Sequence, residues 1–325
     1  MLHTTSSITA SDHLDHLLAR WAVNRGGHRV EPGLHLLGVP GKNSPVFVTA
    51  NYTLSFDALR SALDGADAYI LVLDTGGINV WCAAGKGTFG TDELVNRLES
   101  TGLGEIVSHR ELVLPQLGAT GVSAHEVKRR SGFSVTYGPV RSADLAEFMR
   151  TGAATEDMRR VRFGLRDRFV LVPVELAHVL LPCALAAVAL YFAVGPLAAW
   201  SAIVSLLAGA VLFPVLLPWL PTPNLSTKGL VLGVVTALPF AAAAFSGHVA
   251  DPLWARVGWP LVYLLGMPQV VSFLALNFTG STTFTSRTGV KREIMTYFPF
   301  MVWMFGASLA LLIVLSVTRF VGGSG

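Results

Sequence analysis

Short apolar runs alternate with polar stretches from Met1 to about Arg168. The runs at 45–49, 69–73 and 133–137 are rich in aliphatic and β-branched residues and predict strands. Cap residues, acids in a first turn and a terminating glycine predict helices at 56–63, 92–100, 124–130 and 143–149. Ser55, Ser123 and Ser142 stand where side chains cap helices. Because strands and helices alternate, we expect a three-layer α/β fold with a mostly parallel sheet.

The first residues carry a weaker pattern. Leu14, Leu17, Leu18 and Trp21 stand at helical spacing. We expect a loosely ordered arm that leads into one helix and ends at the glycine pair 26–27.

Beyond Arg168, five apolar stretches are each long enough for a bilayer, which takes roughly 20 apolar residues. Basic residues precede the first stretch and follow the fourth, and the positive-inside rule puts both groups in the cytoplasm. We therefore expect a multi-pass protein of the cytoplasmic (inner) membrane, with a cytosolic α/β domain and its C-terminal end on the opposite side. The predicted spans are 169–193, 197–219, 229–247, 254–278 and 298–320, and the basic residues are Arg159, Arg160, Arg162, Arg166, Arg168, Arg287, Lys291 and Arg292.

Composition agrees with this division. The chain is 52% hydrophobic and 14% charged, whereas soluble domains carry roughly 25% charged residues. Membrane lipid is thus an expected partner, and a formal net charge of +3 gives no reason to expect nucleic acid. Residues 1–15 are polar and lack the apolar segment of a secretory signal. We expect an N-terminal arm (1–30), an α/β domain (31–155), a basic juxtamembrane linker (156–168), a transmembrane domain (169–321) and a linker scar (322–325).

Two polar features of the membrane part have open interpretations. Glu175 and His178 stand one turn apart in the first span, either as a small intramembrane site or as a pair near the helix end. The hydroxyl-rich loop 279–286 is either a solvated connector or a docking surface.

The chain has two cysteines, too few for a disulfide framework or for an iron–sulfur cluster of its own, which takes about four thiolates. Cys183 falls in an apolar span, where a buried inert thiol is expected. Cys82 follows the strand at 69–73, at the edge where open α/β sheets place their ligands. It is either a small buried hydrophobe or, with Lys86 one helical turn further on, a thiolate ligand or nucleophile.

Two familiar kinds of site are not supported around Cys82. The run 85–88 lacks the spacing of a phosphate-binding P-loop. A thiol nucleophile needs a histidine partner, and no spacing ties His109 or His125 to Cys82.

The sequence Asn79-Val-Trp-Cys-Ala-Ala-Gly-Lys86 resembles the cap-helix motif of the membrane-anchored corrinoid proteins of anaerobic mercury methylation. The resemblance extends to residues 45–63, to 138–141 and to the loop 278–286, and so covers most of the chain from about Gly33. The α/β domain is also distantly similar to the corrinoid domain of the corrinoid iron–sulfur protein of acetyl-CoA synthesis. The resemblance implies a Rossmann-like corrinoid-binding domain with a cap helix, followed by an all-α membrane domain of five transmembrane helices.

The same resemblance implies the site. Cys82 would be the lower axial ligand of a corrinoid cobalt, on a cap helix that lies against the lower face of the ring. Small residues on that helix would let the flat macrocycle approach the backbone. Trp81 would either wall the cofactor or pack the helix onto the sheet, and Lys86 would pair with the corrinoid or remain solvated. The implied cofactor-binding residues are Thr49, Asn51, Asn79, Val80, Trp81, Cys82, Ala83, Ala84, Gly85, Lys86, Gly121, Val122, Gly138 and Pro139.

The function implied by the resemblance is methyl transfer to mercury. A methyltransferase would deliver the methyl group of a methyltetrahydrofolate-type donor to the cobalt, which a ferredoxin-like [4Fe–4S] protein keeps reduced. The methyl group would pass as a carbanion equivalent to Hg(II), forming methylmercury, and a thiolate below the cobalt favours departure with the bonding pair. Two alternatives remain open: a methyl carrier with another acceptor, and a non-catalytic cobamide-binding sensor or transporter.

Overall fold

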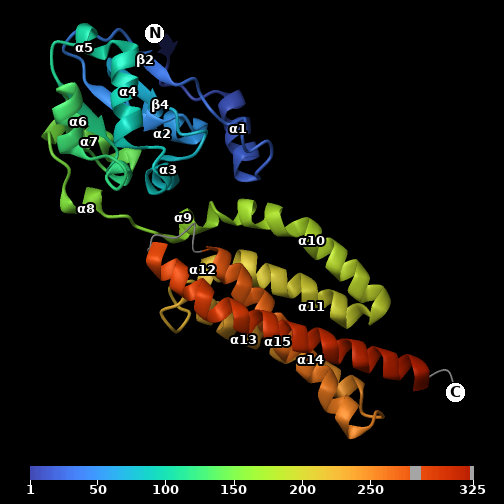
Figure 1. Ribbon diagram of the computed structural model, residues 1–325. Helices are drawn as coiled ribbons and strands as arrows, with labels where there is room; N and C mark the ends of the chain where they lie inside the picture. The colour runs from blue at the N-terminus through green and yellow to red at the C-terminus, as the bar shows by residue number, and fades with distance from the viewer. Residues whose placement is uncertain (279–286, 323–325) are drawn as a thin grey trace. The chain divides into compact units, whose positions relative to one another are not determined.

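The computed structural model describes residues 1–278 and 287–322, so 279–286 and the end of the expected linker scar lie outside the described residues. It divides into two compact units, Met1–Arg162 and Phe163–Gly325. The first is a sheet with helices on its faces, and the second is helical in its described part (Figure 1). The expected order, a mostly parallel α/β fold followed by long apolar helices, is confirmed.

The sheet of the first unit has six strands in the order β1-β2-β4-β3-β5-β6. The four strands β3 to β6 run parallel, whereas β2 is antiparallel to β4 and β1 is parallel to β2. Every residue of β4 is buried, because helices cover both faces of a parallel sheet. The strands are β1 (Leu2–Thr4), β2 (Gly33–Leu37), β3 (Val46–Ala50), β4 (Ala68–Leu73), β5 (Glu111–Leu114) and β6 (Ser134–Tyr137).

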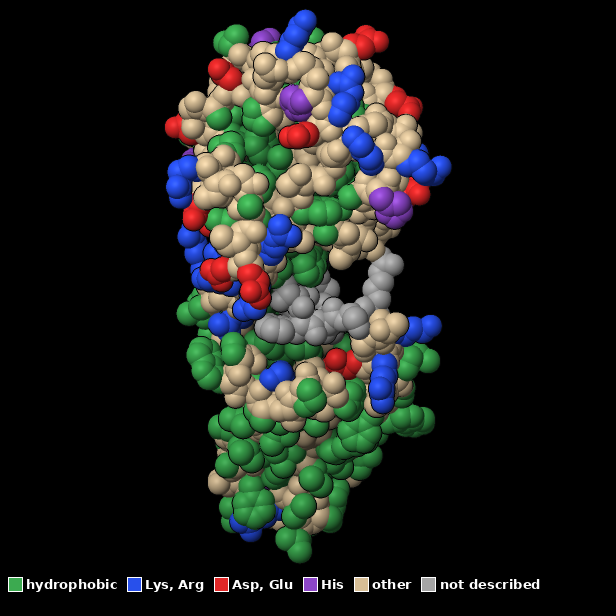
Figure 2. All heavy atoms as spheres, turned by 90° about the vertical axis from the view of Figure 1, so that its left-hand side faces the viewer, with side chains coloured by type: hydrophobic (Ala, Val, Ile, Leu, Met, Phe, Trp, Pro, Cys, Tyr) green, Lys and Arg blue, Asp and Glu red, His purple; other side chains and the backbone are tan. Residues whose placement is uncertain are grey.

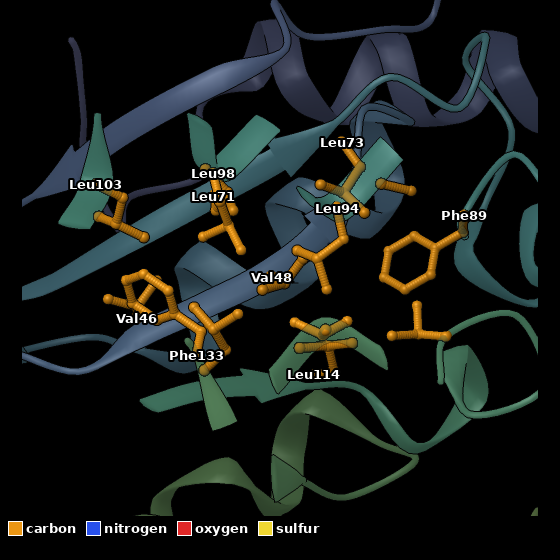
Figure 3. Packing of buried hydrophobic residues seen from close by; sticks show 14 of the residues in the cluster. Val46, Val48, Leu71, Leu73, Phe89, Leu94, Leu98, Leu103, Leu114 and Phe133 are labelled. Carbon is orange, nitrogen blue, oxygen red and sulfur yellow. The ribbon is translucent and has the colours of Figure 1, made fainter. Parts of the chain in front are cut away.

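Helices cover the sheet in two layers. On one face, α2 (Thr53–Ala62) and α7 (Leu145–Thr151) pack on alternate residues of β3 and β4. On the other, α3 (Val80–Lys86), α4 (Thr91–Thr101) and α6 (Ala124–Ser131) enclose the core seen in Figure 3. The unit also contains α1 (Ala10–Arg20), α5 (Leu103–Ile106) and α8 (Glu156–Arg159).

The beginning of the chain differs from the expected loose arm. Residues Leu2–Thr4 form the edge strand β1, and α1 starts at an N-cap, Thr9, whose side chain and that of Asp12 form a capping box. The helix ends at Arg20, before the glycine pair at 26–27. The N-terminal segment is thus part of the first unit.

Of the three predicted serine caps, Ser123 has the predicted position without the capping hydrogen bond, and Ser55 and Ser142 do not occupy N-caps of α2 and α7. Tyr52 occupies the N-cap of α2, which places Ser55 inside its first turn. Ser123 stands at the N-cap of α6, but its hydroxyl lies 3.1 Å from Nδ1 of His125 and makes no capping bond. Ser142 begins a short 3-10 turn, Ser142–Asp144, ahead of α7.

In the second unit, five helical stretches of the described residues are long and apolar enough to cross a membrane, which confirms the predicted number. Hydrophobic side chains dominate the visible surface of this unit, whereas charges are spread over the first (Figure 2). The stretches are Leu165–Ala193, Pro196–Leu216, Leu225–Gly247, Leu253–Asn277 and Thr288–Val321. They consist of α9 (Leu165–Phe169), α10 (Val172–Ala193), α11 (Pro196–Leu207), a π-helical turn (Ala208–Leu212), α12 (Phe213–Leu216), α13 (Leu225–Gly247), α14 (Leu253–Asn277) and α15 (Arg287–Gly322).

Small residues let the apolar helices pack closely. A Cβ added at Gly229 of α13 would lie 2.5 Å from Cβ of Ala275 on α14, so only glycine allows this approach. Polar groups bridge the same pair of helices, since the Ser272 hydroxyl donates to the Ser226 carbonyl at 2.7 Å. Glu175 and His178 lie on α10, as the pattern predicted.

The predicted basic linker is divided between the two units. The Met158 carbonyl accepts from the Val140 amide within the first unit, whereas Phe163 packs in a core cluster of the second. Arg168, the last residue of the expected basic linker, is 5% exposed. Its guanidinium donates to the carbonyls of Pro214 and Val215, because α12 ends there and leaves these oxygens without helical partners.

Candidate functional site

The motif 79–86 forms α3, a short helix with a defined start and end. Oδ1 of Asn79 accepts a hydrogen bond from the Cys82 amide at 2.9 Å and so caps the first turn. Gly87 ends the helix in the left-handed region, at φ 89°, where other residues are strained. The position of Cys82 is therefore fixed by the residue that begins the motif.

The two faces of α3 have different roles. Val80, Ala83 and Ala84 are buried against the sheet, and Ala83 has no exposed surface. Cys82 is half-buried and Gly85, three residues further, is exposed on the same face. A Cβ added at Gly85 would meet no atom within 4 Å. The outer face therefore presents a thiol beside open space.

The burial of α3 changes the expected reason why Ala83 and Ala84 are small. Ala83 and Ala84 are small because they pack against the core, not because a macrocycle must approach them. Trp81 is 38% exposed, so part of its ring is open to a ligand and the rest is covered by the protein. Lys86 is exposed at the last turn of α3.

Asn51, at the carboxyl end of β3, organises the loop that precedes α3. Its Oδ1 accepts hydrogen bonds from the amide and hydroxyl of Thr75 and from the amide of Gly77, at 2.9 to 3.1 Å. Its Nδ2 donates to Oδ1 of Asp74 at 3.1 Å. With 1% of its surface exposed, Asn51 holds the loop from inside the protein.

The other predicted site residues converge on the same edge, where Gly121 is partly buried and the rest are buried. Thr49 is 3% exposed within β3. Gly121 and Val122 follow β5 and pack under α3, where a Cβ at Gly121 would lie 2.9 Å from Cα of Ala84. Gly138 donates its amide to the Leu114 carbonyl at 2.8 Å, and Pro139 is buried beside it. These residues support α3 and the neighbouring loops.

The segment 20–29 borders the site, although the sequence pattern suggested only an arm. Burial raises the pKa of Tyr52, while the nearby Arg20 and Arg25 act to lower it and Cys82 adds to the rise. The phenol therefore stays protonated near neutral pH. Arg29 lies against the loop before α3, within 3.6 Å of a Cβ built on Gly77. The sequence signal that could have indicated this border is the polar segment 24–29, which follows Trp21, the last residue of the apolar stripe.

His28 holds the segment 20–29 in place through contacts of both ring nitrogens. It is 4% exposed, with Nδ1 2.7 Å from Oδ1 of Asp15 and Nε2 2.6 Å from the Val23 carbonyl. Burial alone would lower the pKa of His28, but the Val23 carbonyl and the Asp15 carboxylate outweigh it and raise this pKa. The charged form of His28 therefore holds the segment most firmly.

Other chemistry-bearing side chains are engaged elsewhere. His109 contacts the Ser44 carbonyl at 2.9 Å, and His125 contacts the Ser123 hydroxyl. Neither histidine is therefore positioned as a partner of the Cys82 thiol. The Cys183 thiol lies on α10, 3.8 Å from the Ala202 carbonyl. Within residues 1–278 and 287–322, no group of three or more His, Cys, Asp or Glu side chains is arranged to hold a metal ion.

Comparison with known proteins relates the first unit to corrinoid proteins. Residues 20–149 match the family model described as CO dehydrogenase/acetyl-CoA synthase delta subunit. The acetyl-CoA decarbonylase/synthase complex subunit gamma of Methanopyrus kandleri is 36% identical over 127 residues, which is 38% of this chain and 27% of that protein. The subunit gamma of Methanocaldococcus jannaschii is 32% identical over 123 residues, 37% of this chain and 25% of that protein.

A third relative carries the cofactor in its name. The corrinoid/iron–sulfur protein large subunit of Moorella thermoacetica is 27% identical over 129 residues, 39% of this chain and 28% of that protein. The chain thus spans about a quarter of the length of these relatives. The first unit is a corrinoid-protein-like domain related to subunits of these complexes.

Proposed function

We propose that the chain is a membrane-anchored corrinoid protein that transfers a methyl group, as a carbanion equivalent, to Hg(II) and forms methylmercury. The observation that carries this proposal is the outer face of α3. There a half-buried cysteine lies beside a glycine that faces open space, on a domain related to corrinoid proteins.

The residues of this face fit a corrinoid. A flat macrocycle needs a surface without protruding side chains, and Gly85 leaves such a surface next to Cys82. Trp81 offers an exposed ring beside it. The three buried residues of α3 anchor the helix to the core, so the outer face is free for a ligand.

The protein groups have distinct tasks in this proposal. Cys82 would ligate the cobalt of the bound corrinoid, and the hydrogen bond from its amide to Asn79 fixes the turn that carries the sulfur. Asn51 holds the loop before the helix in one conformation. When bound, the corrinoid supplies a cobalt ion that can carry a methyl group.

The thiolate explains the choice of acceptor. Hg(II) is an electrophile and takes a methyl group together with its bonding pair. The anionic sulfur of Cys82 would supply electron density to the bound cobalt, and the protein ligand is one of the main means by which a protein tunes a cofactor metal. Cys82 would therefore favour transfer of the methyl group with its bonding pair, the form that Hg(II) takes, over transfer as a cation equivalent.

Two protein partners follow from the proposal. The chain has two cysteines, so the electrons that keep the cobalt reduced would come from a ferredoxin-like [4Fe–4S] protein. A methyltransferase would deliver the methyl group of a methyltetrahydrofolate-type donor. The five apolar helices would hold the corrinoid domain on the cytosolic side of the inner membrane.

The test is methyl transfer by the full chain, reconstituted anaerobically in detergent with methylcobalamin. We expect bound corrinoid in the visible spectrum and methylmercury after addition of Hg(II). Cys82→Ala should abolish the transfer and Cys82→His should impair it severely, because the anionic sulfur is lost. The matched control is Cys183→Ala, which removes the thiol on α10 and should leave the transfer intact.

The outcomes separate the alternatives. A Cys82→Ala chain that keeps both its spectrum and its activity would contradict the axial-ligand role. A wild-type chain that binds corrinoid but never methylates Hg(II) would point to another acceptor or to a sensor.

A further inference from the structure

Helix α1 turns its apolar stripe away from the protein. Leu14, Leu17, Leu18 and Trp21 recur at i, i+3, i+4 and i+7, and they are 56%, 53%, 36% and 43% exposed. A surface helix of a globular protein normally turns such a stripe toward the core. In this chain the apolar face of α1 is exposed to solvent and its polar face contacts the protein.

The polar face of α1 is the face that contacts the protein. Asp12 pairs with Arg60 of α2 at 2.8 Å, and His16 contacts Asp57 of the same helix at 2.7 Å. Asp57 and Arg60 are 2% and 7% exposed and lie 2.6 Å apart. Rotating α1 to bury its leucines would remove Asp12 and His16 from this buried ion pair and place apolar side chains against it, which is unfavourable. The outward orientation is therefore fixed.

Positive charge follows the stripe. Arg20, Arg25 and Arg29 come at or after the end of α1, whereas its two acids, Asp12 and Asp15, are paired with Arg60 and His28. Leucines followed by a tryptophan and arginines are typical of a helix that lies in the interface of an anionic membrane. Tryptophan in particular is enriched at that depth.

The chain segment that joins the two units is short, and this bears on which partner the stripe of α1 can reach. Only residues 159–162 separate the buried Met158 of the first unit from Phe163, which packs in the second. Five residue steps span at most about 18 Å. If the long apolar helices cross a bilayer, the first unit is held at its surface, and this high local concentration lets a small apolar stripe bind.

We propose that α1 lies in the headgroup region of the membrane that holds the second unit, with its four exposed apolar residues inserted and the arginines on anionic lipid. This inference rests on the membrane anchoring included in the proposed function and is independent of the methyl chemistry. A lipid surface is the occupant that explains both the apolar stripe and the cations behind it.

The test measures the depth of single labels in the full chain, reconstituted in nanodiscs. In a Cys82→Ser, Cys183→Ser background, a bimane label is placed at Leu17→Cys or at Ala58→Cys. Ala58 is the matched control, because it is exposed on α2 of the same unit but lies outside the stripe. A Cys82→Ser chain that keeps Cys183 reports whether α10 is inserted.

Lipids that carry a doxyl quencher near the headgroup should quench the label at 17 several-fold more than the label at 58. The quenching at 17 should increase with the fraction of phosphatidylglycerol and weaken at high salt. If the Cys183 label is quenched by deep doxyl lipids while the label at 17 is not, membrane docking of α1 is wrong and the anchoring stands. If neither is quenched, the anchoring itself is wrong.

Two other outcomes would also overturn the proposal. A blue shift of the label at 17 that depends on the number of chains per disc would show a second copy on the stripe. A shift that occurs in detergent only after a ferredoxin is added would show a protein partner there.

Discussion

The substitution Gly121→Ala tests how the loop after β5 supports the cap helix. A Cβ at this position would lie 2.9 Å from Cα and 3.1 Å from the carbonyl oxygen of Ala84, and closer still to the carbonyl oxygen of Phe89. Weak carbon–oxygen contacts are about 3.3–3.6 Å, so the two segments would have to separate. Because all three atoms belong to the backbone, no side-chain rotation relieves the contact. We expect destabilisation toward the upper end of the roughly 1–3 kcal/mol typical of overpacking.

The assay is denaturant unfolding of the full chain in detergent, followed by the reactivity of the Cys82 thiol in a Cys183→Ser background. Gly121→Ala should lower the unfolding midpoint and expose the thiol earlier, because the displaced segment carries α3. The matched control is Gly41→Ala, where an added Cβ meets no atom within 4 Å. Equal midpoints and equal thiol reactivity for the two variants would refute the packing of this loop under α3.

Three further predictions concern the site and its border. Gly85→Leu should prevent corrinoid uptake, read from visible absorbance, because the side chain fills the open face; Gly85→Ala should stabilise the cofactor-free chain by about 0.5–1 kcal/mol. Asn51→Ala should expose residues 74–79 to hydrogen exchange and cost several kcal/mol, because each buried donor left without a partner costs about 1–3 kcal/mol. The raised pKa of His28 means that its contribution to stability is full below its unfolded value of 6.5 and is lost as the pH rises through the folded value. Protection factors of residues 20–29 should therefore fall as the pH rises above 6.5, and His28→Gln should remove this dependence.

The strands with a continuous apolar signal were predicted closely. The run at 69–73 corresponds to β4 at 68–73, since a strand buried on both faces has no polar residue to obscure it. β2 escaped prediction because His35 interrupts its apolar run. In the structure this histidine is 6% exposed and packs 4.9 Å from the ring of Phe56, and burial lowers its pKa. β1 has three residues and becomes a strand only by pairing with β2.

The orientation of the site helix was beyond sequence patterns. A seven-residue helix has too few turns for its apolar positions to define a face, so Ala83 and Gly85 both counted as small residues. Contact with the loop at Gly121 decides that Ala84 is buried. The hydrogen bonds of Asn51 reach residues 23 to 26 positions away, a separation that local pattern does not report. The cofactor role of these residues remains a prediction until corrinoid binding is measured.

The dependence of α3 on Asn51 has a consequence for protein engineering. The eight residues of the cap motif are not a portable module, because their conformation is completed by side chains and loops from two other strands. Grafted alone onto another α/β scaffold, the motif would keep its own cap at Asn79. It would lose the hydrogen bonds from Asn51 to the preceding loop and the packing of Ala84 against Gly121. A transplant that preserves the cysteine geometry has to carry three chain segments: the end of β3, the loop after β4 with α3, and the loop after β5.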